Sequence, residues 1–91
     1  MWQLVATSRF ERRLARFRQA RPDLRQRIAQ VLRDLEADPF QPHLHLHPLK
    51  GELAGLHAVS VTYAYRLTLT LKVSEHEIVL LDLGTHDEVY Q

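Results

Sequence analysis

The sequence predicts a small α+β domain with the element order β-α-α-β-β-β, in which a helical hairpin packs on one face of a mostly antiparallel sheet. Apolar residues recur at the helical period in the first 38 residues and at the strand period of two after residue 56. Between these regions, residues 39–55 contain three prolines and two glycines, which interrupt any long regular element. With 91 residues, 45% of them hydrophobic, the chain 1–91 suits one compact domain and leaves no room for a second.

The N-terminal half predicts one strand and then two antiparallel helices. Residues 2–6 are mostly apolar, and Ser8 with Glu11 has the spacing of a capping box that begins a helix. Pro22 suits the first turn of a second helix, and Pro39 ends it because a residue before proline is pushed out of the α region. The apolar residues expected to face the core are Phe10, Leu14 and Phe17, then Leu24, Ile28, Val31, Leu32 and Leu35.

Three further strands are expected after residue 56. In the first, Val59, Val61 and Tyr63 alternate with small or polar residues, and in the second apolar residues alternate with polar ones between residues 66 and 73. The continuous apolar run Ile78–Leu81 is typical of a central strand that is covered on both faces.

The alternation in the second of these strands predicts a groove. If its leucines pack against the helices, Arg66, Thr68 and Thr70 point to the opposite face of the sheet. Nothing in so short a chain remains to cover that face. We therefore expect an open sheet surface with Arg66 at the rim of a groove.

Positive charge is concentrated in the helical half. Residues 1–38 contain nine arginines and five acidic residues, whereas residues 39–91 contain three basic and six acidic residues, so the halves carry net charges of +4 and −3. The arginines either form a solvated helix face or bind phosphate groups or an acidic partner. The use of arginine favours phosphate, because the guanidinium fork matches phosphate oxygens.

The sequence excludes several classes of protein. There is no cysteine, so neither a disulfide framework nor a thiolate zinc site contributes to stability. No segment approaches the roughly 18 apolar residues that a membrane helix needs, and the N-terminus lacks the pattern of a signal peptide. We therefore expect a soluble, cytoplasmic protein that does not bind a membrane.

Three short motifs hold the polar residues best suited to chemistry. They are His-Pro-Leu-Lys-Gly at 47–51, Tyr-Arg-Leu at 65–67, and Gly-Thr-His at 84–86 with Tyr90 four residues after the histidine. In this order along the predicted elements, the motifs resemble those of the RelE/ParE toxin superfamily, particularly its YafQ-like members. The resemblance implies a RelE-like fold for the whole chain.

The resemblance also implies a function. Such proteins are toxins of type II toxin–antitoxin systems, and the YafQ-like members are endoribonucleases that cleave messenger RNA on the ribosome through the message's own 2′-hydroxyl, with no metal or cofactor. That chemistry needs a base, a cation beside the phosphate and an acid for the departing 5′-oxygen. By position, His47 matches the base, Arg66 the cation and His86 the acid.

The candidate substrate-binding residues are Lys50, Tyr90, Arg12, Arg13 and Arg16. The implied partners are the ribosome, its message and a cognate antitoxin, with a toxin–antitoxin hetero-oligomer as the expected assembly.

Two departures from the YafQ-like pattern leave other interpretations open. YafQ-like toxins have a further histidine and an aspartate where this chain has Ser60 and Ala64. We therefore prefer the arrangement of YoeB-like toxins, built from His47, Arg66 and His86. The alternatives are a ParE-like inhibitor of DNA gyrase without nuclease activity, and an inactive relative.

Ordinary structural roles also stay open for these residues. His47 could pack beside Pro48, Arg66 could pair with an acid, Lys50 could be a solvated loop charge and Tyr90 could anchor the tail.

Three histidines, His43, His45 and His47, alternate along the chain, so in an extended segment they would lie on one side as metal ligands could. We nevertheless do not predict a metal site. A spacing of two rarely places three rings tetrahedrally, and no acidic fourth ligand is adjacent.

Overall fold

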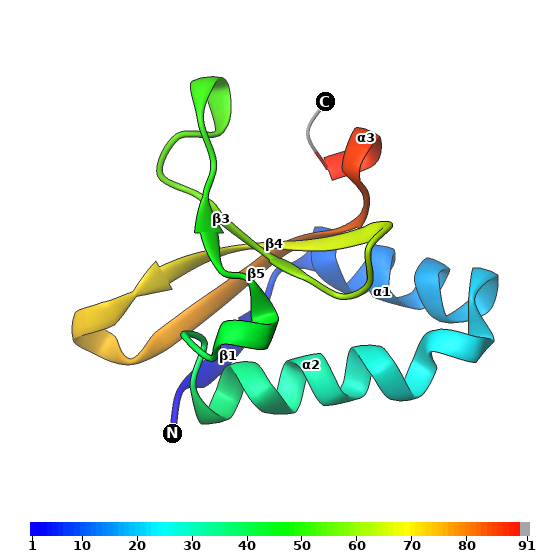
Figure 1. Ribbon diagram of the computed structural model, residues 1–91, viewed down its shortest axis with the longest axis horizontal. Coiled ribbons are helices and arrows are strands. Elements are labelled where there is room, and N and C mark those ends of the chain that lie inside the picture. The colour runs from blue at the N-terminus through cyan, green and yellow to red at the C-terminus, as the bar shows by residue number, and fades with distance from the viewer. Residues whose placement is uncertain (90–91) are drawn as a thin grey trace.

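The computed structural model describes residues 1–89, in which two long helices form a hairpin beneath a twisted sheet (Figure 1). The helices are α1 (Ser8–Ala20), α2 (Arg25–Ala37) and the short α3 (His86–Val89). The strands are β1 (Gln3–Ala6), β2 (His47–Pro48), β3 (His57–Ser60), β4 (Tyr65–Lys72) and β5 (Glu77–Thr85). The predicted β-α-α-β-β-β order is confirmed, with a two-residue edge strand and a short C-terminal helix in addition. Within residues 1–89, no helix is long and apolar enough to cross a membrane.

The strands form one mixed sheet in the order β1-β5-β4-β3-β2. β1 runs parallel to β5, and the other neighbouring strands are antiparallel. β5 therefore lies inside the sheet, as its continuous apolar run predicted. β2 lies at the other edge of the sheet, within the proline- and glycine-containing region 39–55.

The core lies between the helical hairpin and one face of the sheet. The predicted helix stripes face it: Phe10, Phe17, Ile28, Val31 and Leu35 are buried, and Leu14, Leu24 and Leu32 pack against them half-buried. From the sheet, Val59, Leu67, Leu69 and Ile78 belong to the same cluster. Because each such side chain contributes about 1.5–3 kcal/mol when fully buried, helices and sheet stabilise one another.

The first helix begins one residue earlier than predicted, because its cap is Thr7 and not Ser8. Thr7 has an extended backbone, and its Oγ1 accepts a hydrogen bond from the Phe10 backbone N–H at 3.2 Å. The same hydroxyl donates to the carbonyl oxygen of Leu80 at 2.8 Å. Thr7 is thus the point where the chain leaves the side of β5 and turns into α1, so the predicted Ser8–Glu11 capping box is wrong.

The turn between β3 and β4 corrects the predicted strand alternation. β3 ends at Ser60, and Tyr63 is 97% exposed in the turn rather than part of a strand face. Val73 is likewise 61% exposed in a turn after β4. Both strands are shorter than the alternation suggested, because a tight turn needs residues that the strand period alone does not reveal.

The face of the sheet opposite the hairpin is only partly open. Thr68 was expected on an uncovered surface, but it is 3% exposed, and its strand neighbour Ala58 is fully buried. α3 packs against β4 and β5. Residues 50–55 project from the same face of the sheet, at a distance from α3 (Figure 1). The two segments border a hollow on this face, which residues of both line.

Candidate functional site

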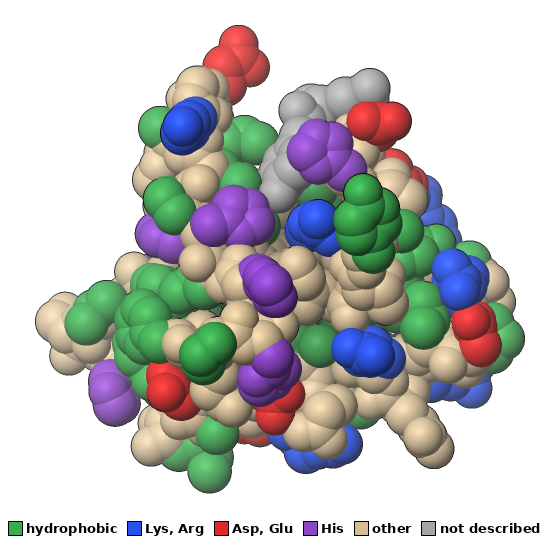
Figure 2. Space-filling model, in the orientation of Figure 1, with side chains coloured by type: hydrophobic (Ala, Val, Ile, Leu, Met, Phe, Trp, Pro, Cys, Tyr) green, Lys and Arg blue, Asp and Glu red, His purple; other side chains and the backbone are tan. Residues whose placement is uncertain are grey.

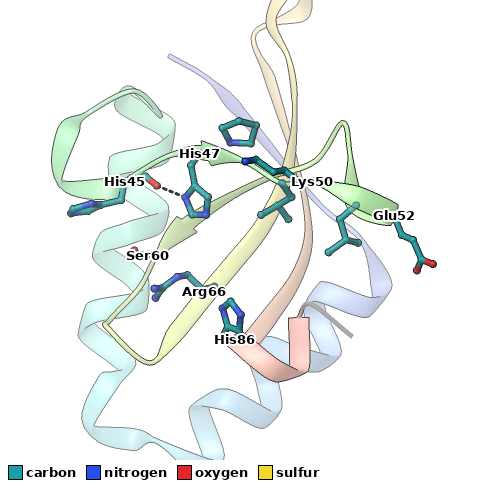
Figure 3. A pocket seen from close by; sticks show the side chains of 10 residues that line it. His45, His47, Lys50, Glu52, Ser60, Arg66 and His86 are labelled. Atoms are coloured by element: carbon teal, nitrogen blue, oxygen red, sulfur yellow. Dashed lines mark hydrogen bonds between the residues drawn. The ribbon is translucent and has the colours of Figure 1, made fainter.

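The hollow is a pocket of about 780 Å³ on the sheet face opposite the hairpin. Figure 2 shows histidine side chains gathered around the hollow. His47, Lys50, Arg66 and His86 lie around it together (Figure 3). Its remaining lining residues are His45, Pro48, Leu49, Glu52, Leu53 and Ser60.

The strand register explains why His47 and Arg66 share this pocket. Ser60 and Gly84 lie directly opposite Arg66 on the two neighbouring strands. His47 pairs with Ala58, which is two residues from Ser60 along β3. Directly opposed residues, and residues two apart along a strand, share a face of the sheet. The face that carries Arg66 therefore also carries His47.

The ring of His47 is oriented by the backbone of His45. His45 ends a 3₁₀ turn in the left-handed conformation, with φ of 55°. Its carbonyl oxygen lies 2.8 Å from Nδ1 of His47. Because a carbonyl oxygen only accepts hydrogen bonds, Nδ1 must carry the proton, and Nε2 of the neutral ring keeps its lone pair. This tautomer leaves Nε2 able to act as a base.

Arg66 is held by the backbone of the β3–β4 turn rather than by an acid. Its Nη1 donates to the carbonyl oxygens of Thr62 and Tyr63, both at 2.9 Å, and to that of Tyr65 at 3.4 Å. No carboxylate of residues 1–89 forms an ion pair with it. The guanidinium therefore keeps its full charge toward the pocket, with Nε and Nη2 as further donors for an anion.

His86 is the first residue of α3, directly after β5 ends at Thr85. Thr85 and Glu88 form a reciprocal capping box: Thr85 N–H donates to Glu88 Oε1 at 2.9 Å, and Glu88 N–H donates to Thr85 Oγ1 at 3.3 Å. The box fixes the first turn of α3, so His86 lies at the mouth of the pocket, across from His47 (Figure 3).

Comparison with known proteins identifies the fold. No family model and no curated protein matches the sequence. Among solved structures, YafQ from Escherichia coli matches over 100% of both chains, with a TM-score of 0.83 and 14% identity. A metal-bound toxin from Helicobacter pylori matches over 99% of this chain and 100% of its own, with a TM-score of 0.81 and 25% identity. The toxin of a YoeB–YefM complex from Staphylococcus aureus matches over 94% and 98%, with a TM-score of 0.73 and 15% identity. The chain has the RelE-like toxin fold.

The helix arginines lie elsewhere on this RelE-like domain. Arg13 Nε is 3.4 Å from Asp82 Oδ1, and Arg16 Nη2 is 2.7 Å from Glu88 Oε2. Both line a second, smaller cleft beside α1, and neither lines the His47 pocket. Arg12 is exposed on α1. Substrate binding by these three arginines therefore stays a prediction. They would bind it outside the pocket that His47 and His86 line.

Tyr90, the remaining predicted substrate-binding residue, lies outside the described residues.

The three alternating histidines do not form one cluster. Residues 42–44 form a 3₁₀ turn instead of an extended strand, and His43 Nε2 contacts Asp34 Oδ2 of α2 at 2.8 Å. Within residues 1–89, no group of three or more histidine, cysteine or acidic side chains is placed to hold a metal ion.

Sequence reasoning missed the residues that hold the three predicted side chains in place. The carbonyl of His45 acts through a backbone conformation, which leaves no signal in the residue type. The Thr85–Glu88 box did leave one, because Thr-x-x-Glu is the pattern of a helix start. The pattern comes directly after the last predicted strand, where no helix is predicted.

Proposed function

We propose that this chain is the toxin of a type II toxin–antitoxin system and acts as an endoribonuclease that cleaves messenger RNA on the ribosome. The RelE-like fold supports a toxin. The observation that carries the nuclease proposal is that His47, Arg66 and His86 line one pocket, two of them held by backbone carbonyls.

In the proposed reaction, Nε2 of His47 takes the proton from the 2′-hydroxyl of the message. The 2′-oxygen then forms a bond to the adjacent phosphorus, and Arg66 stabilises the negative charge that develops on the phosphate oxygens. As the bond to the 5′-oxygen breaks, His86 donates a proton to that oxygen. The products are a 2′,3′-cyclic phosphate and a 5′-hydroxyl, and the two histidines exchange protonation states.

Ser60 and Ala64 favour this YoeB-like set over the YafQ-like one. Ser60 lines the pocket beside Arg66, but its hydroxyl cannot take the place of an imidazole as a base near neutral pH. Ala64 is exposed in the β3–β4 turn and has no polar side-chain atom. The proposed base, cation and acid are therefore His47, Arg66 and His86.

The proposed partners are a cognate antitoxin and the translating ribosome in the cytoplasm. The matched Staphylococcus aureus toxin was solved as a YoeB–YefM complex. Arginines of α1 and α2 would contact an acidic segment of the antitoxin in the toxin–antitoxin complex, and RNA phosphates when the toxin is bound to the ribosome.

Expression in a bacterial host tests the proposed function. We expect the parent chain to arrest growth and to produce new message ends in primer extension, whereas His86→Ala produces neither. His43→Ala is the matched control, because His43 contacts α2 and does not line the pocket. Growth arrest without new ends, together with inhibition of gyrase supercoiling by the purified protein, would support a ParE-like activity instead.

A further inference from the structure

The side chain of Glu88 links α1, β5 and α3 beside the pocket. It does not line the pocket itself, and each of its carboxylate oxygens has a separate contact. Oε1 accepts from the Thr85 N–H at 2.9 Å, and Oε2 accepts from Arg16 Nη2 at 2.7 Å. Arg13 Nη1 lies 3.8 Å from the same Oε2. Glu88 therefore joins the start of the His86 helix to two arginines of α1.

α3 needs such a link, because four residues are too few for a helix to be stable alone. Its far end is anchored by Val89, which is 5% exposed. Its near end depends on the box between Thr85 and Glu88. His86 is the first residue of this turn, so the box sets where its backbone lies.

Gly84 provides the space in which Glu88 folds back. A Cβ at position 84 would lie 2.9 Å from Glu88 Oε1 and 3.1 Å from Glu88 Cβ, both too close for an unstrained contact. The backbone of Gly84 is not in the left-handed region, so close approach is the reason for glycine here. Gly84, Thr85 and Glu88 thus form one local unit that ends β5 and begins α3.

The electrostatics favour the ionised carboxylate in this place. The hydrogen bond from the Thr85 backbone N–H is the main cause that lowers the pKa of Glu88, and Arg16 and Arg13 lower it further. Arg13 also forms an ion pair with Asp82, so its guanidinium lies between two carboxylates. Glu88 therefore stays charged and keeps both contacts at neutral pH.

We infer that Glu88, held by Arg16 and given space by Gly84, is a positioning residue that fixes His86 at the mouth of the pocket. The kinetic part of this inference rests on the proposed nuclease function. Glu88 touches no reacting atom and acts only through the place of His86.

The inference is tested first by NMR of the His86 imidazole carbon and proton signals, which does not depend on activity. We expect Glu88→Ala to move and broaden these signals and Arg16→Gln to move them less. Glu88→Gln should restore them in part, because an amide oxygen can still accept from the Thr85 N–H. Ile28→Val is the matched control: it lowers Tm through the core and should leave the His86 signals unchanged. The inference is wrong if the His86 signals of Glu88→Ala coincide with those of the parent.

Cleavage kinetics on translating ribosomes give a second test. Misplacement of an acid by about 1 Å can cost about a hundredfold, so we expect Glu88→Ala to lower kcat by about ten- to a hundredfold with KM nearly unchanged. A parent protein that cleaves no message contradicts the proposed function, while the His86 signals still decide the positioning role. An unchanged kcat in Glu88→Ala, with an active parent, overturns the inference.

Discussion

Backbone carbonyls orient two of the three proposed catalytic side chains. The carbonyl of His45 selects the tautomer of His47, and the carbonyls of Thr62, Tyr63 and Tyr65 hold Nη1 of Arg66. Carbonyl groups do not titrate, so these orientations are independent of pH in the range where histidines change charge. The protonation of the rings can therefore change during a reaction without loss of the geometry.

Arg66→Lys tests whether the guanidinium shape matters. An ammonium on a flexible stem cannot both donate to the turn carbonyls and present a fork to a phosphate, so we expect cleavage to fall by about ten- to a hundredfold. Lys72→Arg, at the far end of the same strand, is the matched control and should cleave normally. Single-turnover cleavage on ribosomes measures both, and equal rates for parent and Arg66→Lys would contradict this role.

At the scale of elements, the ends of helices and strands position the site. β5 passes directly into α3 at Thr85, and β1 passes into α1 at Thr7. The 3₁₀ turn at 42–44 brings the chain from α2 to the edge strand β2, and His43 contacts Asp34 on the way. These junctions, rather than the middle of any element, bring distant residues to one pocket.

Thr7→Ala should destabilise the protein, whereas Ser8→Ala should not. Loss of the cap removes the acceptor for Phe10 N–H, which costs about 1 kcal/mol, and also removes the donor to Leu80. Urea unfolding measures the free energy of both variants. A larger loss in Ser8→Ala than in Thr7→Ala would restore the cap that the sequence first suggested.

The contact between Asp34 and His43 predicts a pH-dependent stability. The hydrogen bond from His43 is the main cause that lowers the pKa of Asp34 from its ordinary value of 3.8, with Gln30 second. Because the folded-state pKa is depressed, the contribution is complete above that ordinary value and is lost as pH falls through the lowered one.

Asp34→Asn should therefore lower Tm at about pH 6 and have a smaller effect at about pH 2, because the stabilisation that accompanies the lowered pKa decreases as the pH falls below the ordinary value of 3.8. Glu75→Gln, an exposed carboxylate in the turn after β4, is the control and should change Tm little at either pH. An equal loss of Tm in Asp34→Asn at both pH values would show that charge at Asp34 is not involved.

At the scale of the whole molecule, the sheet has one face for stability and one for the pocket. The alternation of Arg66 with Leu67 predicted this division correctly, because strand period is a property of the residues themselves. Thr68 was predicted less well: it is buried on a sheet against which α3 packs, and the sequence analysis did not predict that helix. The ion pairs of Arg13 and Arg16 could not be predicted either, since their partners are about seventy residues away and are brought close only by the fold.

The pocket's shape follows from these same long-range contacts. Local pattern placed His47 in the irregular segment 39–55, Arg66 in a strand and His86 after the last strand, but only the sheet order brings β2, β4 and the end of β5 to one hollow. The left-handed backbone of His45 and the early cap at Thr7 depend on neighbouring chain segments, which a single stretch of sequence does not specify.

Identification of the cut ends on a defined message bound to ribosomes tests the central claim most directly. With the purified protein, we predict a 2′,3′-cyclic phosphate on the upstream fragment and a 5′-hydroxyl on the downstream one, as seen by mass spectrometry. A message with a 2′-deoxy nucleotide at the cleaved position should remain intact. Cleavage of that 2′-deoxy message, or a 5′-phosphate on the downstream fragment, would contradict a reaction in which His47, Arg66 and His86 act around a single phosphate.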